Sequence, residues 1–130
     1  MHALAQPSAL TANAAIGTAL NILNKWSCTE KEKMAILGVG RSTLHKYQAS
    51  AEGARLTPDL LERISYLLNI HALLRTIFEN PDNIYGFVRM PNRSAFFGGK
   101  APMDIMSSGL MTALYEVYKH LDAIRSGEFA

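Results

Sequence analysis

The chain has 130 residues, of which 48% are hydrophobic and 18% charged, and its formal net charge is +2. This composition indicates one folded domain, or two small lobes on a shared core, and excludes a disordered chain. The charge is too small to require a nucleic-acid partner, so a basic surface would have to be local. The single cysteine, Cys28, excludes an internal disulfide, and with only four histidines a structural zinc site is not expected.

The chain holds no apolar run near the roughly 18 residues that a membrane span needs. The apolar stretch 12–23 is interrupted by polar residues and lacks a preceding basic segment, so it does not resemble a secretory signal. We therefore expect a soluble protein of the cytoplasm. Residues 1–12 mix small polar and apolar side chains with Pro7, and we predict a flexible N-terminal tail there.

Helical signals follow one another through the first two thirds of the chain. Apolar residues spaced by three and four predict a first helix from Thr11 or Asn13 to about Trp26. The run Thr29-Glu30-Lys31-Glu32 has the form of a capping box, and it predicts a short helix that ends at Gly38.

A third short helix is predicted at about 42–49. The run Thr57-Pro58-Asp59 then predicts the start of a long helix that ends near Asn80. On its apolar face lies His71, which we interpret as a core histidine with a hydrogen-bond partner.

Turn residues become frequent after Asn80. Residues 84–88 fit a short strand or a helical turn, and we favour the helical turn because no second strand-like run exists to pair with it. A short helix is predicted at about 101–107 and a last one at about 110–125. The last helix carries apolar residues at spacings of 4, 3, 4 and 3, and this seam faces either the core or a second protomer: Leu110, Leu114, Val117, Leu121 and Ile124.

The prediction is thus an all-α protein with three segments. Residues 1–12 form the tail, 13–80 a helix-turn-helix domain, and 81–130 a small helical C-terminal domain. The helix-turn-helix is the segment 30–48, in which Ala35 is the small residue at the helix crossing, Gly38-Val39-Gly40 is the turn, and Leu44 is buried.

In this interpretation the second helix of the motif would enter the DNA major groove with its polar residues. The predicted DNA-binding residues are Arg41, Ser42, Thr43, His45, Lys46 and Tyr47. An ordinary helical hairpin with a solvated polar face remains an alternative, as does a motif that only dimerises.

No catalytic signature is present: the chain lacks Gly-x-Ser-x-Gly, a phosphate-binding Gly-Lys-Ser/Thr loop and His-Glu-x-x-His. Cys28 beside a helix start could be activated, but a lone cysteine near Trp26 is more often half-buried and inert. His120 and Glu116 are interpreted as an ordinary i,i+4 pair. We predict no enzyme, no catalytic residue, no cofactor and no metal site.

The C-terminal third contains the more specific pattern. Residues 92–109 read Asn-Arg-Ser-Ala-Phe-Phe-Gly-Gly-Lys-Ala-Pro-Met-Asp-Ile-Met-Ser-Ser-Gly, and a later helix ends in Tyr-Lys-His-Leu-Asp-Ala at 118–123. This run resembles the toxin-binding domain of the Xre/MbcA/ParS antitoxin family. Met103 stands where the family usually has Leu, and Leu110-Met111 follow Gly109 where it often has an acidic residue. Residues 14–80 look like the Xre-like helix-turn-helix half of the same family.

The resemblance implies an antitoxin of a type II toxin–antitoxin system. Its partner would be a toxin, commonly with a RES domain that consumes NAD, and the chain would dimerise and repress its own operon. The residues predicted to contact the toxin are Arg93, Phe97, Lys100, Met103, Arg125, Gly127, Glu128 and Phe129. The last four belong to a tail that could enter the toxin's active site, with Glu128 pairing with a phosphate-binding arginine and Phe129 filling an apolar slot; a frayed C-terminus is the alternative.

A second reading is a stand-alone helix-turn-helix repressor whose C-terminal half serves only dimerisation. It explains the helix-turn-helix equally well, but it does not account for the Phe-Phe-Gly-Gly-Lys-x-Pro run at 96–102.

Overall fold

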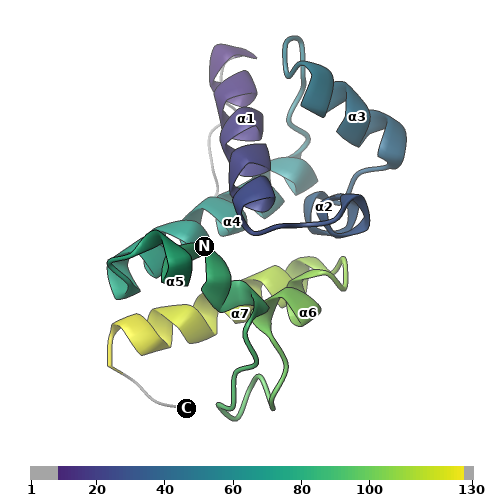
Figure 1. The fold of residues 1–130 in the computed structure, drawn as a ribbon. Coiled ribbons are helices and arrows are strands. Elements are labelled where there is room, and N and C mark those ends of the chain that lie inside the picture. The colour runs from purple at the N-terminus through teal and green to yellow at the C-terminus, as the bar shows by residue number, and fades with distance from the viewer. Residues whose placement is uncertain (1–8, 128–130) are drawn as a thin grey trace.

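A computed structural model describes residues 9–127, and every regular element in that range is helical. The elements are α1 (Ala9–Lys25), α2 (Glu30–Leu37), α3 (Arg41–Ala49), α4 (Pro58–Ile77), α5 (Pro81–Gly86), the 3-10 helix η1 (Phe87–Arg89), α6 (Pro102–Met106) and α7 (Met111–Arg125). The all-α prediction is confirmed, with a helix-turn-helix half followed by a helical C-terminal half (Figure 1). Between residues 9 and 127, no helix has the length and apolar character needed to cross a membrane.

Local capping explains why two helices, α2 and α4, begin where the sequence predicts. The Thr29 hydroxyl accepts from the Glu32 N–H at 3.1 Å, and the Glu32 carboxylate accepts from the Thr29 N–H at 2.9 Å. The Thr57 hydroxyl likewise accepts from the Leu60 N–H at 3.2 Å, just before Pro58 opens α4. Each cap satisfies N–H groups that have no partner inside the helix.

Two helix boundaries differ from the predicted ones by several residues. The first helix begins at Ala9 rather than at Thr11 or Asn13. The long helix ends at Ile77 instead of Asn80, because Phe78 takes an extended conformation and Asn80 caps the next helix, its side-chain oxygen accepting from the Asn83 N–H at 2.9 Å. Residues 84–88 are helical, as predicted, in α5 and η1.

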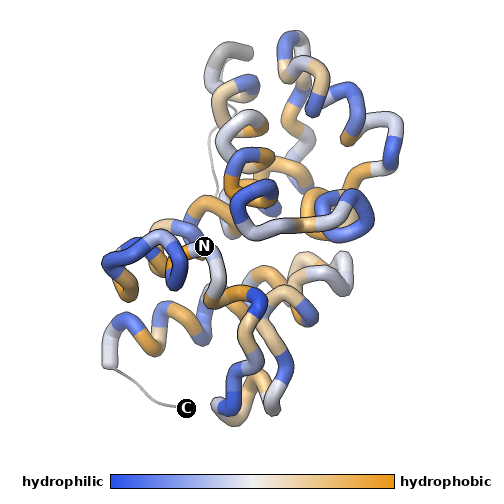
Figure 2. Tube along the Cα trace, in the orientation of Figure 1, coloured by the Kyte–Doolittle hydropathy of each residue, from blue (hydrophilic) through white to orange (hydrophobic). Residues whose placement is uncertain are grey.

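Helix α4 lies at the centre of the molecule, between the N-terminal helices and α7 (Figure 1). It is buried on more than one side, since Tyr66 packs against Tyr115 and Tyr118 of α7 while Arg63 contacts α2. In Figure 2, hydrophobic residues concentrate along α4, whereas α3 is largely hydrophilic. The two halves therefore share one core.

The seam on α7 faces this shared core. Leu114, Val117 and Leu121 are fully buried, and Ile124 is half-buried. Leu110, at the start of the seam, is 61% exposed. The central part of the seam thus packs within the chain and is not available to a second protomer.

Phe97 and Met103, which we predicted to contact the toxin, are buried in this structure. Each side chain is only 1% exposed and belongs to the core. Phe96, by contrast, is half-buried and stacks on His120 with ring centroids 3.9 Å apart. Two adjacent aromatic residues in a turn point in different directions, and composition alone does not decide which of them is inside.

Candidate nucleic-acid and protein interfaces

The turn between α2 and α3 has the geometry of a helix-turn-helix. Gly38 ends α2 in the left-handed conformation, with φ at +65°, which favours glycine. Gly40 is the N-cap of α3 with an ordinary φ of −80°, so only the first of the two turn glycines needs its conformational freedom. Leu44 is fully buried and Val39 is half-buried, as the motif requires.

The outer side of α3 carries four of the six predicted DNA-binding residues. Arg41, Ser42, His45 and Lys46 are exposed, and their spacing of one and four residues places them on one side of the helix. Thr43 and Tyr47 are half-buried beside the core residue Leu44. The exposed residues thus form one polar side of a helix, and an α-helix is an element that the major groove admits.

Glu30, in the first turn of α2, faces this surface and was not anticipated from the sequence. One oxygen of its carboxylate, Oε1, lies 2.9 Å from Arg41 Nε and 3.0 Å from His45 Nε2. The hydrogen bond from His45, followed by the charges of His45 and Arg41, lowers the pKa of Glu30 against its partial desolvation. The ionised carboxylate thus faces Arg41 and His45, two of the three basic residues of α3, the helix predicted to enter the major groove.

Arg63 holds α2 against α4 from inside the protein. Its side chain is 11% exposed; Nε donates to Asp59 Oδ2 at 2.9 Å, and Nη1 donates to the Ala35 carbonyl at 3.2 Å and the Ile36 carbonyl at 3.4 Å. These carbonyls lie in the last turn of α2, where a cation is favoured. The only signal for this role in the sequence is an arginine one turn after Asp59 among apolar neighbours.

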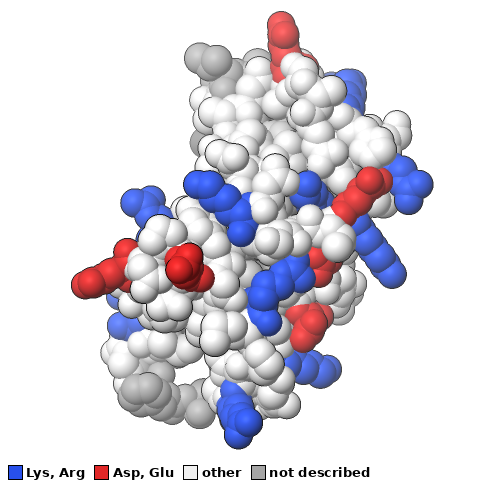
Figure 3. All heavy atoms as spheres, viewed as in Figure 1, with Lys and Arg blue, Asp and Glu red and all other residues white. Residues whose placement is uncertain are grey.

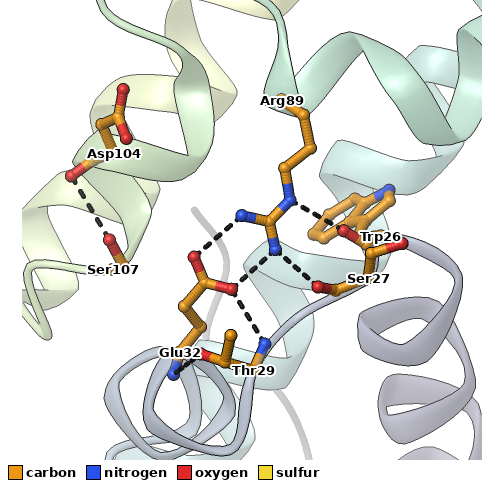
Figure 4. A network of polar contacts seen from close by, with 7 residues as sticks. All are labelled: Trp26, Ser27, Thr29, Glu32, Arg89, Asp104 and Ser107. Atoms are coloured by element: carbon orange, nitrogen blue, oxygen red, sulfur yellow. Dashed lines mark hydrogen bonds and ion pairs between the residues drawn. The ribbon is translucent and has the colours of Figure 1, made fainter.

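Arg89 joins the C-terminal half to the start of the helix-turn-helix (Figure 4). Its guanidinium donates to the carbonyls of Trp26 and Ser27, each at 2.9 Å, and to both carboxylate oxygens of Glu32. Trp26 is fully buried, and Ser27 has a positive φ of 60° in the tight connection between α1 and α2. Arg89 thereby fixes the connection that precedes the helix-turn-helix.

The Phe-Phe-Gly-Gly-Lys run forms a loop that closes on Asn92. The Gly99 N–H donates to the Asn92 carbonyl at 2.8 Å, and the Asn92 N–H donates to the Lys100 carbonyl at 3.0 Å. Gly98 and Gly99 both have positive φ, at 57° and 90°, which this closure requires. The loop buries Phe97 and leaves Arg93 and Lys100 exposed at its base.

The predicted tail contacts are only partly described. Arg125 is exposed, and its guanidinium donates to Asp122 Oδ1 at 2.7 Å and 2.9 Å. Gly127 is exposed with φ at +82°. Glu128 and Phe129 lie outside the described residues.

Charges of both signs are interspersed on the surface, and the thiol of Cys28 is partly buried. On the face seen in Figure 3, lysine and arginine side chains are scattered among acidic ones and form no single large patch. Burial raises the pKa of the Cys28 thiol to about 11, the opposite of what an activated nucleophile needs. Cys28 is half-buried, as we expected, and its raised pKa favours the interpretation that it is unreactive.

Comparison with known proteins defines the class. Residues 5–69 match the family described as the antitoxin Xre-like helix-turn-helix domain, and residues 73–127 match the antitoxin Xre/MbcA/ParS C-terminal toxin-binding domain. The fold is thus that of an antitoxin with a helix-turn-helix half and a toxin-binding half.

The chain belongs to the Xre/MbcA/ParS antitoxin family, and a toxin is its indicated partner. It is also 34% identical over 107 residues to the uncharacterized protein y4oB of Sinorhizobium fredii, an alignment that covers 82% of this chain and 80% of that protein.

Proposed function

We propose that this chain neutralises a RES-type toxin that consumes NAD and is encoded next to it, and that it does so in the cytoplasm. The match of residues 73–127 to a toxin-binding domain carries this proposal. The exposed cations Arg93 and Lys100, together at the base of the closed loop, favour an acidic surface on the toxin. The tail from Arg125 to Ala130 is the segment that would reach into the toxin's active site.

Co-expression of the chain with the protein of the adjacent gene tests this proposal. A complex that co-purifies through size exclusion with mass detection, together with relief of toxicity, is the expected result. The double variant Arg93→Glu/Lys100→Glu and a chain lacking residues 125–130 should each bind the toxin more weakly. Lys31→Glu is the matched control, because Lys31 is an exposed cation in the first turn of α2, outside the toxin-binding half. Persistent toxicity with no complex would contradict the antitoxin role.

We also propose that the helix-turn-helix binds the DNA upstream of its own gene and represses the operon. The polar side of α3, with Leu44 turned into the core, is the observation that supports this. Arg41→Gln and Lys46→Gln should weaken binding and lower the salt slope by about one for each phosphate contact removed. Binding to the DNA would be measured by fluorescence anisotropy at salt concentrations from about 50 to about 200 mM.

A homodimer would place two copies of α3 on half-sites about 34 Å apart. The mass of the chain alone in solution checks this step, and a monomer would contradict it. A dimer that represses its promoter and yet leaves the neighbouring protein toxic would instead support the stand-alone repressor.

A further inference from the structure

We propose that Glu30 is an intramolecular competitor of DNA, whose carboxylate occupies Arg41 and His45 of the recognition helix and thereby limits their contacts with phosphate. This inference rests on the proposed DNA binding by α3 and names a residue that sets its strength. Neither the helix-turn-helix pattern nor the family match assigns a role to Glu30.

The contacts that carry the inference are direct. Glu30 Oε1 lies 2.9 Å from Arg41 Nε and 3.0 Å from His45 Nε2, so a single oxygen engages both side chains. Arg41 and His45 stand one helical turn apart on the exposed side of α3, beside the equally spaced Ser42 and Lys46. A phosphate or guanine that approaches either group in the same direction must first displace the carboxylate.

The high exposure of the three side chains indicates that their contact competes with a ligand and adds little to the stability of the fold. The side chains of Arg41, His45 and Glu30 are 74%, 54% and 44% exposed, and an ion pair so open to water adds little to stability. The buried guanidinium of Arg63 holds α4 against α2 through the Ala35 and Ile36 carbonyls, whereas the Glu30 contact covers the surface offered to DNA. The same carboxylate would stand close to the phosphate backbone in a complex, where like charges repel.

Occupation of Arg41 and His45 by the carboxylate, and its repulsion of phosphate, both lower the affinity for DNA. Neither effect depends on the DNA sequence. Phosphate contacts position a protein on any duplex, so a carboxylate that blocks them weakens specific and non-specific binding alike. Glu30 would keep the free helix-turn-helix from accumulating on unrelated DNA. Stable binding would then depend on the other contacts that the helix-turn-helix makes with the DNA upstream of its own gene.

The test is a double-mutant cycle between Glu30 and Arg41, with the full-length chain. The proteins are wild type, Glu30→Gln, Arg41→Gln and the double variant, and the probes are the upstream duplex of the gene and a scrambled duplex of equal composition. Thermal melting checks that each variant is folded. Affinities are measured by fluorescence anisotropy at several salt concentrations.

Glu30→Gln should tighten binding to both duplexes by about two- to fivefold, the range that exposed ion pairs span. The slope of log affinity against log salt should steepen by about one, because one more cation meets phosphate. In the Arg41→Gln background, the gain from Glu30→Gln should shrink to what His45 alone provides. Glu52→Gln is the control: Glu52 is exposed just after α3 and, among the described residues, pairs with neither Arg41 nor His45, so its effect should be the same in both backgrounds.

Equal gains from Glu30→Gln with and without Arg41 would overturn the inference, because Glu30 would then act only as a general negative charge. Weaker binding by Glu30→Gln would also overturn it and would show that Glu30 orients Arg41 for DNA. If wild type binds and Glu30→Gln is unchanged, only this inference fails. If neither protein binds either duplex, the proposed repression fails with it.

Discussion

Arg89 and Glu32 form a two-point ion pair across 57 residues of sequence, with Nη1 2.9 Å from Oε2 and Nη2 2.6 Å from Oε1. Glu32 is also the carboxylate of the capping box that opens α2. One side chain from the toxin-binding half therefore bears on the helix cap at which the helix-turn-helix begins. Paired forks of this kind are among the stronger side-chain contacts in proteins.

Removal of the guanidinium should loosen this junction. Arg89→Met would strand the Trp26 and Ser27 carbonyls and the Glu32 carboxylate, and we expect the free energy of unfolding to fall by about 1.5 to 3 kcal/mol. Urea denaturation measures the loss. Arg93→Met, at an exposed arginine in the neighbouring loop, should change stability by no more than about 0.5 kcal/mol. Equal stability of the two variants would contradict the role given to Arg89.

The same pair predicts a sensitivity to acid. The hydrogen bond from Arg89 lowers the pKa of Glu32 below its ordinary value of 4.5, so the folded protein binds this proton less tightly than the unfolded chain. The resulting stability is present above pH 4.5 and is lost as the pH falls through the lowered pKa. The gap in unfolding free energy between wild type and Arg89→Met should narrow over that range, without closing, since the bonds to the two carbonyls do not titrate. A gap that widens in acid would refute this.

Gly38 should resist substitution because of both conformation and space. Its φ is +65°, and an added Cβ would stand 2.7 Å from Arg63 Nε. The left-handed conformation alone costs about 1 to 2 kcal/mol for an alanine, and displacement of the buried arginine adds to this. Gly17→Ala is the matched control: Gly17 lies inside α1 with open space around it, and alanine there should stabilise by about 0.5 to 1 kcal/mol. The measurement is the melting temperature of Gly38→Ala and of Gly17→Ala. A shift in the same direction for both variants would disprove this account.

His71 predicts a second loss of stability at mildly acidic pH. Burial, and then the charges of Arg75 and Lys25, lower the pKa of His71 below 6.5, while its ring stacks on Tyr85 with centroids 5.7 Å apart. The neutral ring is favoured in the folded state, so this stability is complete above pH 6.5 and declines as the pH falls toward the lowered pKa. His71→Gln should flatten the fall in unfolding free energy between pH 7 and 5. An NMR titration of the His71 ring with a midpoint above 6.5 would exclude this explanation.

Cys28 should react slowly in the folded protein. Desolvation raises the pKa of its thiol from 9.0 to about 11, which leaves about a hundredth of the usual thiolate near neutral pH. The greater nucleophilicity of a more basic thiolate offsets part of this, so alkylation at pH 8 should be about tenfold slower than in the denatured chain. Mass spectrometry after timed iodoacetamide treatment measures both rates. Equal rates would show that the thiol is open to solvent and unperturbed.

The sequence predicts the helices well because their ends are set locally. These local signals are the pair Thr29 and Glu32, the step from Thr57 to Pro58, and Gly38. Each acts on neighbours within a few residues, so the sequence predicts the bounds of α2 and the start of α4. The predicted end of the long helix at Asn80 is nevertheless wrong, because Asn80 caps α5 instead. That role depends on the chain turning there, which the local sequence does not specify. The Phe-Gly-Gly-Lys pattern identified the family for the same reason: it is a short, continuous run.

The class of fold, the polar side of α3 and the kinship to antitoxins can therefore be predicted from local patterns of residues. The burial of Phe97 rather than Phe96, the contact of Arg89 with Glu32 and the position of Glu30 opposite Arg41 and His45 are seen only in the folded chain. These outcomes depend on contacts between elements that are separate in the sequence. Caps and turns are governed by atoms a few bonds apart, whereas a buried ring or a long-range ion pair exists only once packing has brought distant elements to one place.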